Sequence, residues 1–345
     1  MRNGEEFIWV DFENAPQVWV LSSIIQRLGE AGIGFQLTAR DFSYTVGLCQ
    51  SIGLEAKIIG TSHVSKGKIG KAARIIARGI QLALFMMPLR RRVHTALSCG
   101  SRSQLIAARL LGIPVIILAD YEYANLTLNR LARYILVPFP IPKDRWRGNK
   151  MKIVHYPGLK EELHLHGFEP SSDLPKDLKP YKERVLVLFR PESRNAHYAS
   201  KQSIVLHEAI LSYLFGFKNM VLIIFPRDEI QKISLKNWCE QKNMFYWFPG
   251  IVNGPDLISK CDLVIGGGGS MTREAAILGI PSYSFFAGKW GAVDRYLESQ
   301  RRLVKISLIE DVGKIVLKKR DKVTASVPAD ALNFVTRFIE DRIIQ

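Results

Sequence analysis

The sequence predicts an α/β fold in which two doubly wound domains face a central cleft. Short apolar runs alternate with helical patterns along the whole chain, as is typical of parallel sheets covered by helices. The alternation breaks once, in a proline-rich segment near the middle, and then restarts. A four-glycine turn follows a buried apolar run in the second half. The 345 residues are 47% hydrophobic, a globular composition with enough length for two domains.

The first domain is expected over residues 1–165. Its strands are predicted where short apolar runs occur, at Phe7–Val10, Gly34–Thr38, Ala56–Ile59, Thr95–Ser98, Val115–Leu118 and Ile135–Val137. Apolar residues at helical spacing lie between these runs. They predict helices over Val18–Ala31, Lys68–Phe85 and Ser103–Leu111.

A linker is predicted over residues 165–182, which are rich in Pro, Ser, Asp and Lys. The second domain is expected over residues 183–327. Its predicted strands are Arg184–Phe189, Met220–Phe225, Phe245–Trp247, Leu263–Ile265, Ser282–Phe285 and Leu303–Ile306. The last segment, 328–345, contains a helix at Ala329–Ile344 with no strand after it, so we expect this helix to pack back on the first domain.

The positive charge of the chain is concentrated in its first half. The chain has 48 Lys and Arg against 32 Asp and Glu, a formal net charge of +16. Residues 1–160 carry +12 of this excess, and residues 56–119 hold 11 basic residues and no acidic one. Such a chain is expected to meet an anionic partner: nucleic acid, an acidic membrane or a phosphorylated small molecule. We expect no nucleic acid, because the basic stretch has few interleaved aromatic residues.

Segment 64–92 has the pattern of a basic amphipathic helix with a bulky apolar end. Four basic residues recur at steps of three, three and four, which places them on one helical face, and apolar residues follow the same period on another face. This pattern favours a helix that lies on an anionic membrane surface. The alternative is a helix packed on the core with a basic outer face. The predicted membrane-facing residues are Lys68, Lys71, Arg74, Arg78, Phe85, Met86, Arg90, Arg91 and Arg92.

Cysteine usage and the N-terminal sequence indicate the compartment. The four cysteines are far apart and form no CxxC pair, which argues against a disulfide scaffold or a zinc ribbon and fits a reducing compartment. The N-terminus has no signal-peptide pattern, and the longest apolar run, Ile80–Leu89, is half of a spanning length. We therefore expect a cytoplasmic protein, peripherally associated with the inner face of the membrane.

The strongest local motif is the glycine-rich turn Leu263-Val-Ile-Gly-Gly-Gly-Gly-Ser270 and the helix that begins near Ser270. Glycines let a ligand approach the backbone closely, and a helix N-terminus offers free N–H groups to a diphosphate. The alternative is a tight turn capped by Ser270. Glu274, one turn into the helix, could accept hydrogen bonds from ribose hydroxyls or simply complement the helix dipole. Arg190, at the end of a predicted strand, is a candidate phosphate ligand or the partner of a surface ion pair with Glu192.

These motifs resemble the nucleotide-sugar-binding half of GT-B enzymes. The chain is similar over most of its length to a family of uncharacterised archaeal and bacterial proteins related to GT-B glycosyltransferases and to non-hydrolysing UDP-N-acetylglucosamine 2-epimerases. The resemblance implies two Rossmann-like domains. It rests on the segments starting at Asp11, Thr38, Asp120, Tyr156, Arg190, Gly266, Gly288 and Ala292.

By this resemblance, the second domain binds a nucleotide-diphosphate sugar, the only small-molecule partner implied besides an acceptor. The nucleobase would contact the segment before the glycines, the diphosphate would lie on the turn, and the ribose would bind Glu274. No Asp-x-Asp motif is present, so no metal and no other cofactor are expected. The implied binding residues are Arg190, Phe248, Gly250, Ile251, Gly267, Gly268, Gly269, Ser270, Met271, Thr272 and Glu274.

The first domain is expected to supply the acceptor side and the catalytic base. Related lipid-linked enzymes have a catalytic His in the first loop, where this chain has Gln17, which cannot act as a base. Asp11 and Glu13 are the nearby alternatives, with Asn14 and Gln17 on the acceptor side. Glu122 matches a catalytic carboxylate of the epimerases, but a second one is replaced by the segment Ser98–Arg102.

Three functions follow from the sequence. The leading one is a metal-independent GT-B glycosyltransferase, similar to the lipid-linked N-acetylglucosaminyltransferase, with a UDP-linked donor and a lipid-linked or membrane-proximal acceptor in surface polysaccharide synthesis. The second is a non-hydrolysing UDP-sugar 2-epimerase. The third is a non-catalytic nucleotide-sugar-binding protein.

Overall fold

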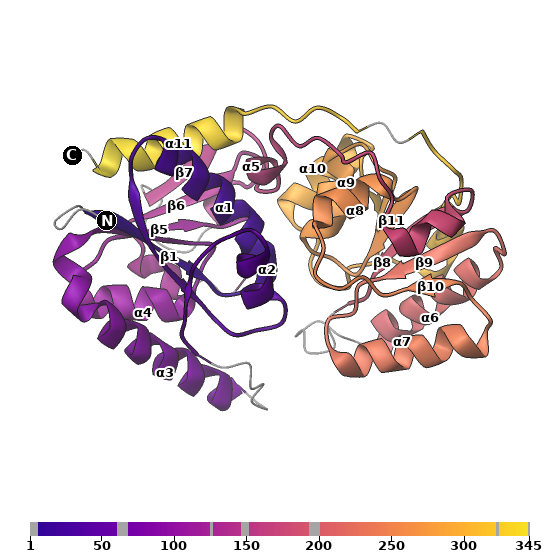
Figure 1. The fold of residues 1–345 in the computed structure, drawn as a ribbon, viewed down its shortest axis with the longest axis horizontal. Coiled ribbons are helices and arrows are strands. Elements are labelled where there is room, and N and C mark those ends of the chain that lie inside the picture. Colours follow the sequence, from indigo (N-terminus) through magenta and orange to yellow (C-terminus); the bar gives the residue numbers. More distant parts are fainter. Residues whose placement is uncertain are drawn as a thin grey trace. The chain divides into compact units, whose positions relative to one another are not determined.

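The computed structural model describes residues 6–60, 68–124, 127–145, 152–192, 201–321 and 324–343. The chain divides into two compact units, each built around its own parallel sheet. The N-terminal unit comprises Met1–His164 and Pro328–Gln345, and the C-terminal unit comprises Leu165–Val327. Figure 1 shows strands enclosed by helices in each unit.

The N-terminal unit has a seven-stranded sheet in the order β3-β2-β1-β4-β5-β6-β7. Its strands are β1 Phe7–Phe12, β2 Gly34–Ala39, β3 Lys57–Ile58, β4 Val93–Ser98, β5 Val115–Leu118, β6 Tyr134–Pro138 and β7 Ile153–Tyr156. The paired strands run parallel, with Val10 of β1 opposite Leu37 of β2 and Leu97 of β4. The central strand β1 is buried along its whole length, as expected for a strand covered on both faces.

The helices of the N-terminal unit lie on both faces of this sheet (Figure 1). They are α1 Ala15–Glu30, α2 Thr45–Ser51, α3 Lys68–Met86, α4 Arg102–Leu111, α5 Glu162–Leu165 and α11 Asp330–Ile343. The C-terminal helix α11 belongs to this unit and packs against α1 and β7. Val335 and Ile339 of α11 are fully buried in the same apolar cluster as Val10 and Leu21.

The C-terminal unit has a six-stranded sheet in the order β10-β9-β8-β11-β12-β13. Its strands are β8 Val185–Arg190, β9 Met220–Ile224, β10 Tyr246–Trp247, β11 Leu263–Gly266, β12 Ser282–Ser284 and β13 Val304–Lys305. Its helices are α6 Lys201–Phe215, α7 Glu229–Gln241, α8 Gly254–Lys260, α9 Ser270–Ile277 and α10 Ala292–Ser299.

The topology of each sheet places its ligand-binding edge. The strand order reverses between β1 and β4 in one unit and between β8 and β11 in the other. In doubly wound sheets, ligands bind at the carboxyl ends of the strands at such a switch point. The β1–α1 loop and the glycine-rich turn after β11 therefore both lie where this fold binds ligands.

One strand differs from the sequence-based expectation. The segment Ile153–Tyr156 forms β7, an edge strand paired with β6, although no strand was predicted there. Pro157 follows it directly, and the surrounding prolines resemble a linker. Prolines are tolerated beside an edge strand, because the ladder there needs fewer N–H donors.

Candidate functional site

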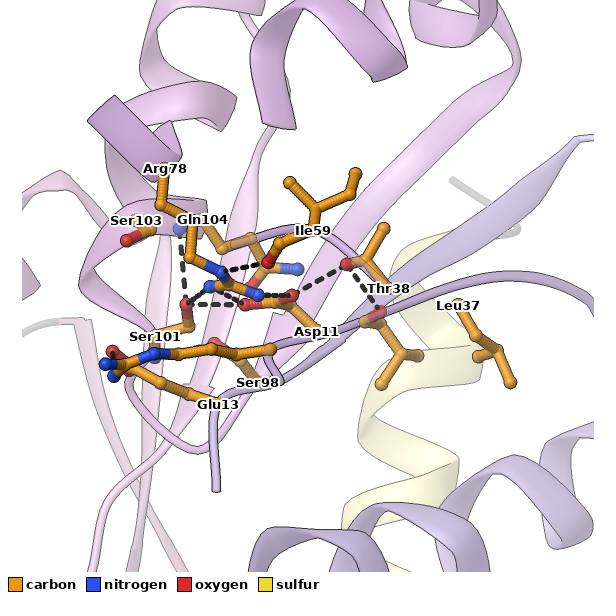
Figure 2. Close-up of polar contacts among 12 residues, drawn as sticks. Asp11, Glu13, Leu37, Thr38, Ile59, Arg78, Ser98, Ser101, Ser103 and Gln104 are labelled. Carbon is orange, nitrogen blue, oxygen red and sulfur yellow. Dashed lines mark hydrogen bonds and ion pairs between the residues drawn. The ribbon is translucent and has the colours of Figure 1, made fainter. Parts of the chain in front are cut away.

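Asp11, at the carboxyl end of β1, holds a buried arginine of α3. Arg78 Nη2 lies 2.7 Å from Asp11 Oδ1, and Arg78 Nη1 lies 2.9 Å from Oδ2. The Ser101 hydroxyl donates to Oδ2 at 2.6 Å and the Thr38 hydroxyl donates to Oδ1 at 2.7 Å (Figure 2). Asp11 is fully buried and Arg78 is 5% exposed. The assignment of Asp11 as a possible base is therefore corrected, since four hydrogen bonds engage its carboxylate and make it a structural anchor.

Glu13 remains the candidate base of this loop. Its carboxylate is half-buried, with Oε1 4.0 Å from Arg40 Nη1. Burial raises the pKa of Glu13 above its ordinary 4.5, and the neighbouring Asp11 raises it further, against the opposing effects of Arg78, Arg102 and Arg40. A carboxylate with a raised pKa is a better proton acceptor near neutral pH than an ordinary one.

Gln17 and Asn14, predicted on the acceptor side, shape the same loop. The side-chain Oε1 of Gln17 accepts a hydrogen bond from the Glu13 N–H at 3.0 Å, and its Nε2 donates to the Cys99 carbonyl at 3.2 Å. Asn14 precedes α1 in an extended conformation, and its carbonyl accepts from the Gln17 N–H at 3.1 Å. Gln17 thus ties the β1–α1 loop to the end of β4 and orients the backbone of Glu13.

A second group of ionisable residues lies after β5 and β7. Lys160 Nζ is 2.6 Å from Asp120 Oδ2, and Glu122 is 6% exposed. Burial lowers the pKa of Lys160, but Asp120 and Glu161 outweigh this effect and raise it, so the ammonium stays protonated. Burial raises the pKa of the Cys99 thiol to about 12, which keeps it protonated and unreactive. Asp120 and Glu161 therefore hold the Lys160 cation in place, whereas Glu122 is a buried carboxylate two residues after Asp120.

The glycine-rich turn lies between β11 and α9. Helix α9 begins at Ser270, and the residue before it is Gly269, with φ +108°. Gly268 also has a positive φ, +89°. The alternative in which Ser270 caps the helix is corrected, since the N-cap position is held by Gly269, which has no side chain. The first turn of α9 therefore presents its backbone N–H groups without a side-chain cap from that position.

The turn is closely packed on its inner side. A Cβ atom on Gly267 would lie 2.7 Å from the backbone N and Cα of Glu192, and one on Gly268 would lie 2.5 Å from the ring of Phe286. Glu192 is 8% exposed, and its Oε1 accepts a hydrogen bond from the Ala287 N–H at 3.2 Å. Only glycine fits these positions, so the turn is held in one shape by packing.

Two arginines brace this region. Arg190 Nη1 donates to the two carbonyl groups that follow β9, at 2.8 and 3.0 Å. Arg227 donates from Nη2 to the Gly268 carbonyl at 3.1 Å and from Nε to the Pro191 carbonyl at 2.8 Å. Arg227 was missed from the sequence, although its place just after a predicted strand could have indicated it. Both guanidinium groups add positive potential beside the turn.

Helix α9 positions the remaining predicted ligands. Thr272 and Glu274 are 2% and 5% exposed, whereas Met271 is half-buried. Arg273 makes a buried ion pair with Asp294 of α10, with Nε–Oδ1 at 2.7 Å and Nη2–Oδ2 at 2.8 Å. This pair fixes α9 against α10 and thereby sets the direction of its N-terminus.

The predicted base-binding segment lies in the loop after the edge strand β10. Phe248 is half-buried and stacks edge-to-face on Tyr246, with the ring centroids 5.4 Å apart. Gly250 and Ile251 are exposed. Among the described residues, no group of three His, Cys, Asp or Glu side chains could hold a metal ion.

Helix α3 turns two of the predicted membrane-facing residues into the core. Its basic residue Arg78 and its apolar residue Met86 are both buried, so their assignment as membrane-facing is wrong. Arg78 turns inward because Asp11 requires a counter-charge in the core. Among the other predicted residues, Arg90 and Arg91 are exposed, Lys71, Arg74, Phe85 and Arg92 are half-buried, and the side chain of Lys68 lies outside the described residues, as does segment 64–67.

An apolar stripe is left exposed along α3 and the residue that follows it. It consists of Ile69, Ile76, Ile80, Leu84 and Met87, which are 48–88% exposed. Their spacing of three, four and seven residues places them on one face. Among the described residues, the helical segment Ile69–Arg92 is long and apolar enough to cross a membrane, by length and composition alone. The sequence-based expectation rested only on the shorter apolar run Ile80–Leu89, which is half of a spanning length. The other side of α3 packs on α4, where a Cβ atom on Gly79 would lie 3.0 Å from Ile106.

Comparison with solved structures identifies the fold. The chain is similar to a UDP-bound S. aureus protein, MnaA, with a TM-score of 0.76 at 12% identity over 98% of this chain and 97% of that one. It is also similar to a UDP-GlcNAc 2-epimerase of Methanocaldococcus jannaschii in complex with UDP-GlcNAc and UDP, with a TM-score of 0.71 at 13% identity over 97% and 99% of the two chains. The chain is also similar to MurG of Acinetobacter baumannii, with a TM-score of 0.50 at 14% identity over 97% of this chain and 99% of MurG. The fold is therefore GT-B-like, as predicted.

Sequence comparison identifies the family. An uncharacterized protein of Methanocaldococcus jannaschii is 28% identical over 319 residues, which cover 88% of this chain and 89% of that protein. The model of the family described as "Protein of unknown function (DUF354)" matches residues 7–345. This match spans nearly the whole chain, and it agrees with the resemblance drawn from the motifs. The chain belongs to the DUF354 family.

Proposed function

We propose that the protein is a metal-independent GT-B glycosyltransferase that moves a sugar from a UDP-linked donor to a lipid-linked or membrane-proximal acceptor. In this proposal the C-terminal unit binds the donor. The turn from Gly267 to Ser270 supports it, because an α9 N-terminus with a glycine at its cap position offers N–H groups and a positive dipole to a diphosphate. Arg227 adds a charge beside the turn. The S. aureus protein solved with UDP shares this fold.

The arrangement of α3 supports the proposal of a membrane-proximal acceptor. One side of this helix reaches the β1 edge through Arg78, and its outer side exposes the apolar stripe defined above. The exposed Arg90 and Arg91 lie at the end of the stripe. Exposed apolar side chains flanked by cations are typical of surfaces that bind anionic lipid. A single helix would thus connect a lipid surface to the acceptor-side loop.

Glu13 is the proposed base for the transfer. An acceptor hydroxyl would lose its proton to the Glu13 carboxylate and attack the anomeric carbon of the donor sugar. The bond from that carbon to the diphosphate oxygen would break, and UDP would leave with the charge. The raised pKa of Glu13 suits this task, whereas Asp11 is engaged by four donors.

An epimerase is the second candidate, because Glu122, the carboxylate that resembles a catalytic residue of the epimerases, is buried two residues after Asp120, which pairs with Lys160. Solved epimerases also share the fold. This reaction needs no acceptor and no membrane. A third possibility is a protein that binds the nucleotide sugar without turning it over.

The deciding experiment incubates the protein with a panel of UDP-sugars, with and without vesicles that contain a sugar linked to a polyprenyl phosphate, whose hydroxyl groups can accept the transfer. We expect UDP release only with the acceptor present. Exchange of deuterium into sugar C2 in heavy water without acceptor would identify an epimerase instead. Saturable UDP-sugar binding with neither reaction would favour the non-catalytic protein. One set of assays thus distinguishes the three functions.

The protein should sediment with anionic vesicles at low salt. Changing Arg90 and Arg91 to Glu reverses two charges near the surface. The lost attraction alone, about 1 kcal/mol per residue, should lower vesicle affinity roughly 30-fold, and the new repulsion should lower it further. Changing Ile76, Ile80 and Leu84 to Ser should remove the part of the binding that resists high salt.

The matched control changes Ile230 and Ile233 of α7 to Ser, since these isoleucines are 69% and 57% exposed in the other unit. This variant should sediment like the wild type. Equal losses in the α3 and α7 variants, or a wild type that stays in the supernatant, would contradict the membrane proposal.

A further inference from the structure

Three arginines from three different elements lie near one another at the β1–α1 loop, and two of them, Arg40 and Arg102, act on Glu13. Arg40 directly follows β2, Arg74 lies on α3 one turn before the buried Arg78, and Arg102 is the first residue of α4. Arg40 Nη1 is 4.0 Å from Glu13 Oε1. These segments are far apart in sequence and meet at the carboxyl edge of β1, β2 and β4, the switch point of the sheet.

The arginines are close enough to repel one another. Burial lowers the pKa of Arg40, Glu13 raises it, and Arg78, Arg74 and Arg102 lower it further. Arg74 Nε is buried and has no hydrogen-bond partner among the described residues. Such an arrangement costs free energy unless a negative group is added.

Two carboxylates of the described residues lie near this cluster, Asp11 and Glu13. Asp11 is engaged by Arg78 and by the Ser101 and Thr38 hydroxyls. Glu13 is then the carboxylate that acts on Arg40 and Arg102, and no acidic residue occurs in the sequence between 56 and 119, the stretch that contains Arg74 and Arg102. The N-terminus of α4, where Ser101 caps the Gln104 N–H, adds positive potential on the same side.

We propose that Arg40, Arg74 and Arg102 form an anion site that binds the phosphate or diphosphate group of a second ligand, separate from the nucleotide at the glycine-rich turn. Guanidinium groups match phosphate oxygens with paired hydrogen bonds, and three of them from different directions suit a group with several such oxygens. Glu13 lies among them, next to the place where the ligand would be held. The site belongs to the N-terminal unit and does not depend on UDP binding.

The test titrates inorganic pyrophosphate into the full-length protein by calorimetry, at constant ionic strength. Because the glycine-rich turn could also take pyrophosphate, the titration is done in a Gly267→Ala background. We expect saturable binding that Arg74→Gln and Arg102→Gln each weaken about tenfold or more, the usual size for a lost charged hydrogen bond. Arg74→Lys and Arg102→Lys should recover part of the affinity, since the charge remains.

Arg109→Gln is the matched control, because Arg109 is exposed on the same helix α4 as Arg102, at its other end. This variant should bind like the wild type, and far-UV circular dichroism should show no variant with a lower thermal midpoint than the wild type. No saturable binding, or the same affinity in the Arg74, Arg102 and Arg109 variants, would overturn the proposal.

Competition then identifies the source of the phosphate. Displacement of pyrophosphate by vesicles with a polyprenyl phosphate, but not by plain anionic vesicles, would assign the site to a lipid ligand. Displacement by a soluble sugar phosphate would assign it to a free metabolite. Binding of pyrophosphate that neither can displace would overturn the assignment to a phosphorylated organic ligand. A protein that passes this test and yet binds no UDP would lose the proposed transferase function but keep this site.

Discussion

Replacing Asp11 with alanine should lower the free energy of unfolding of the N-terminal unit by about 3–5 kcal/mol, because it leaves the buried Arg78 without its counter-charge. The side chain of Arg78 is 6% exposed, so water cannot replace the carboxylate. The Ser101 and Thr38 hydroxyls would lose their acceptor as well. Urea unfolding followed by far-UV circular dichroism, read on the transition of this unit, measures the change.

Two comparisons make this result specific. Removing both charges with Asp11→Ala and Arg78→Met should be less costly than the sum of the two single changes, since no unpaired charge remains. The exposed pair Arg27–Glu30, 3.7 Å apart, supplies the control, and Glu30→Ala should cost less than about 1 kcal/mol. If Asp11→Ala cost no more than Glu30→Ala, the ion pair would not be the anchor of α3.

Gly267→Ala should reduce UDP affinity about 100-fold or more. The new Cβ would lie 2.7 Å from the Glu192 backbone, so the chain must shift, and a displacement near 1 Å in a binding site is enough for a loss of that size. Glu274→Ala should lose only about tenfold, through its proposed ribose contacts. Calorimetric titration with UDP measures both variants.

Gly313→Ala is the matched control for the glycine-rich turn. A Cβ on Gly313, in the same unit, would meet nothing within 4 Å, and this glycine is not among those with positive φ. The variant should bind UDP like the wild type. A Gly267→Ala protein with unchanged UDP affinity would separate the turn from nucleotide binding and would remove the main support for the donor site.

Most strands could be predicted because they are buried on both faces. Val115–Leu118 and Leu186–Phe189 are continuous apolar runs, and such runs can be recognised without any knowledge of their neighbours. The exception, β7, is a short edge strand inside a proline-rich region, where local composition favours a loop. Its pairing with β6 stabilises it, and that is a tertiary contact.

The glycine-rich turn was also visible in the sequence, because its chemistry is local. A buried strand, four glycines and a helix start lie within eight residues of Leu263, and this order places backbone N–H groups at a strand end. What the sequence did not reveal is the packing around it. Arg227 and Phe286 reach the turn from other strand ends, and their positions depend on how the sheet is assembled.

For α3, the sequence determined the composition of its faces, and the tertiary structure decided their direction. The helical period of basic and apolar residues is a property of the chain alone. Which face turns inward depends on Asp11, 67 residues away, because a carboxylate buried at the end of β1 must be paired with a cation. That requirement draws Arg78 into the core and leaves the apolar stripe from Ile69 to Met87 exposed. The exposure of the apolar stripe and the position of Arg74 beside Arg40 both follow from this one long-range ion pair, which no local pattern encodes.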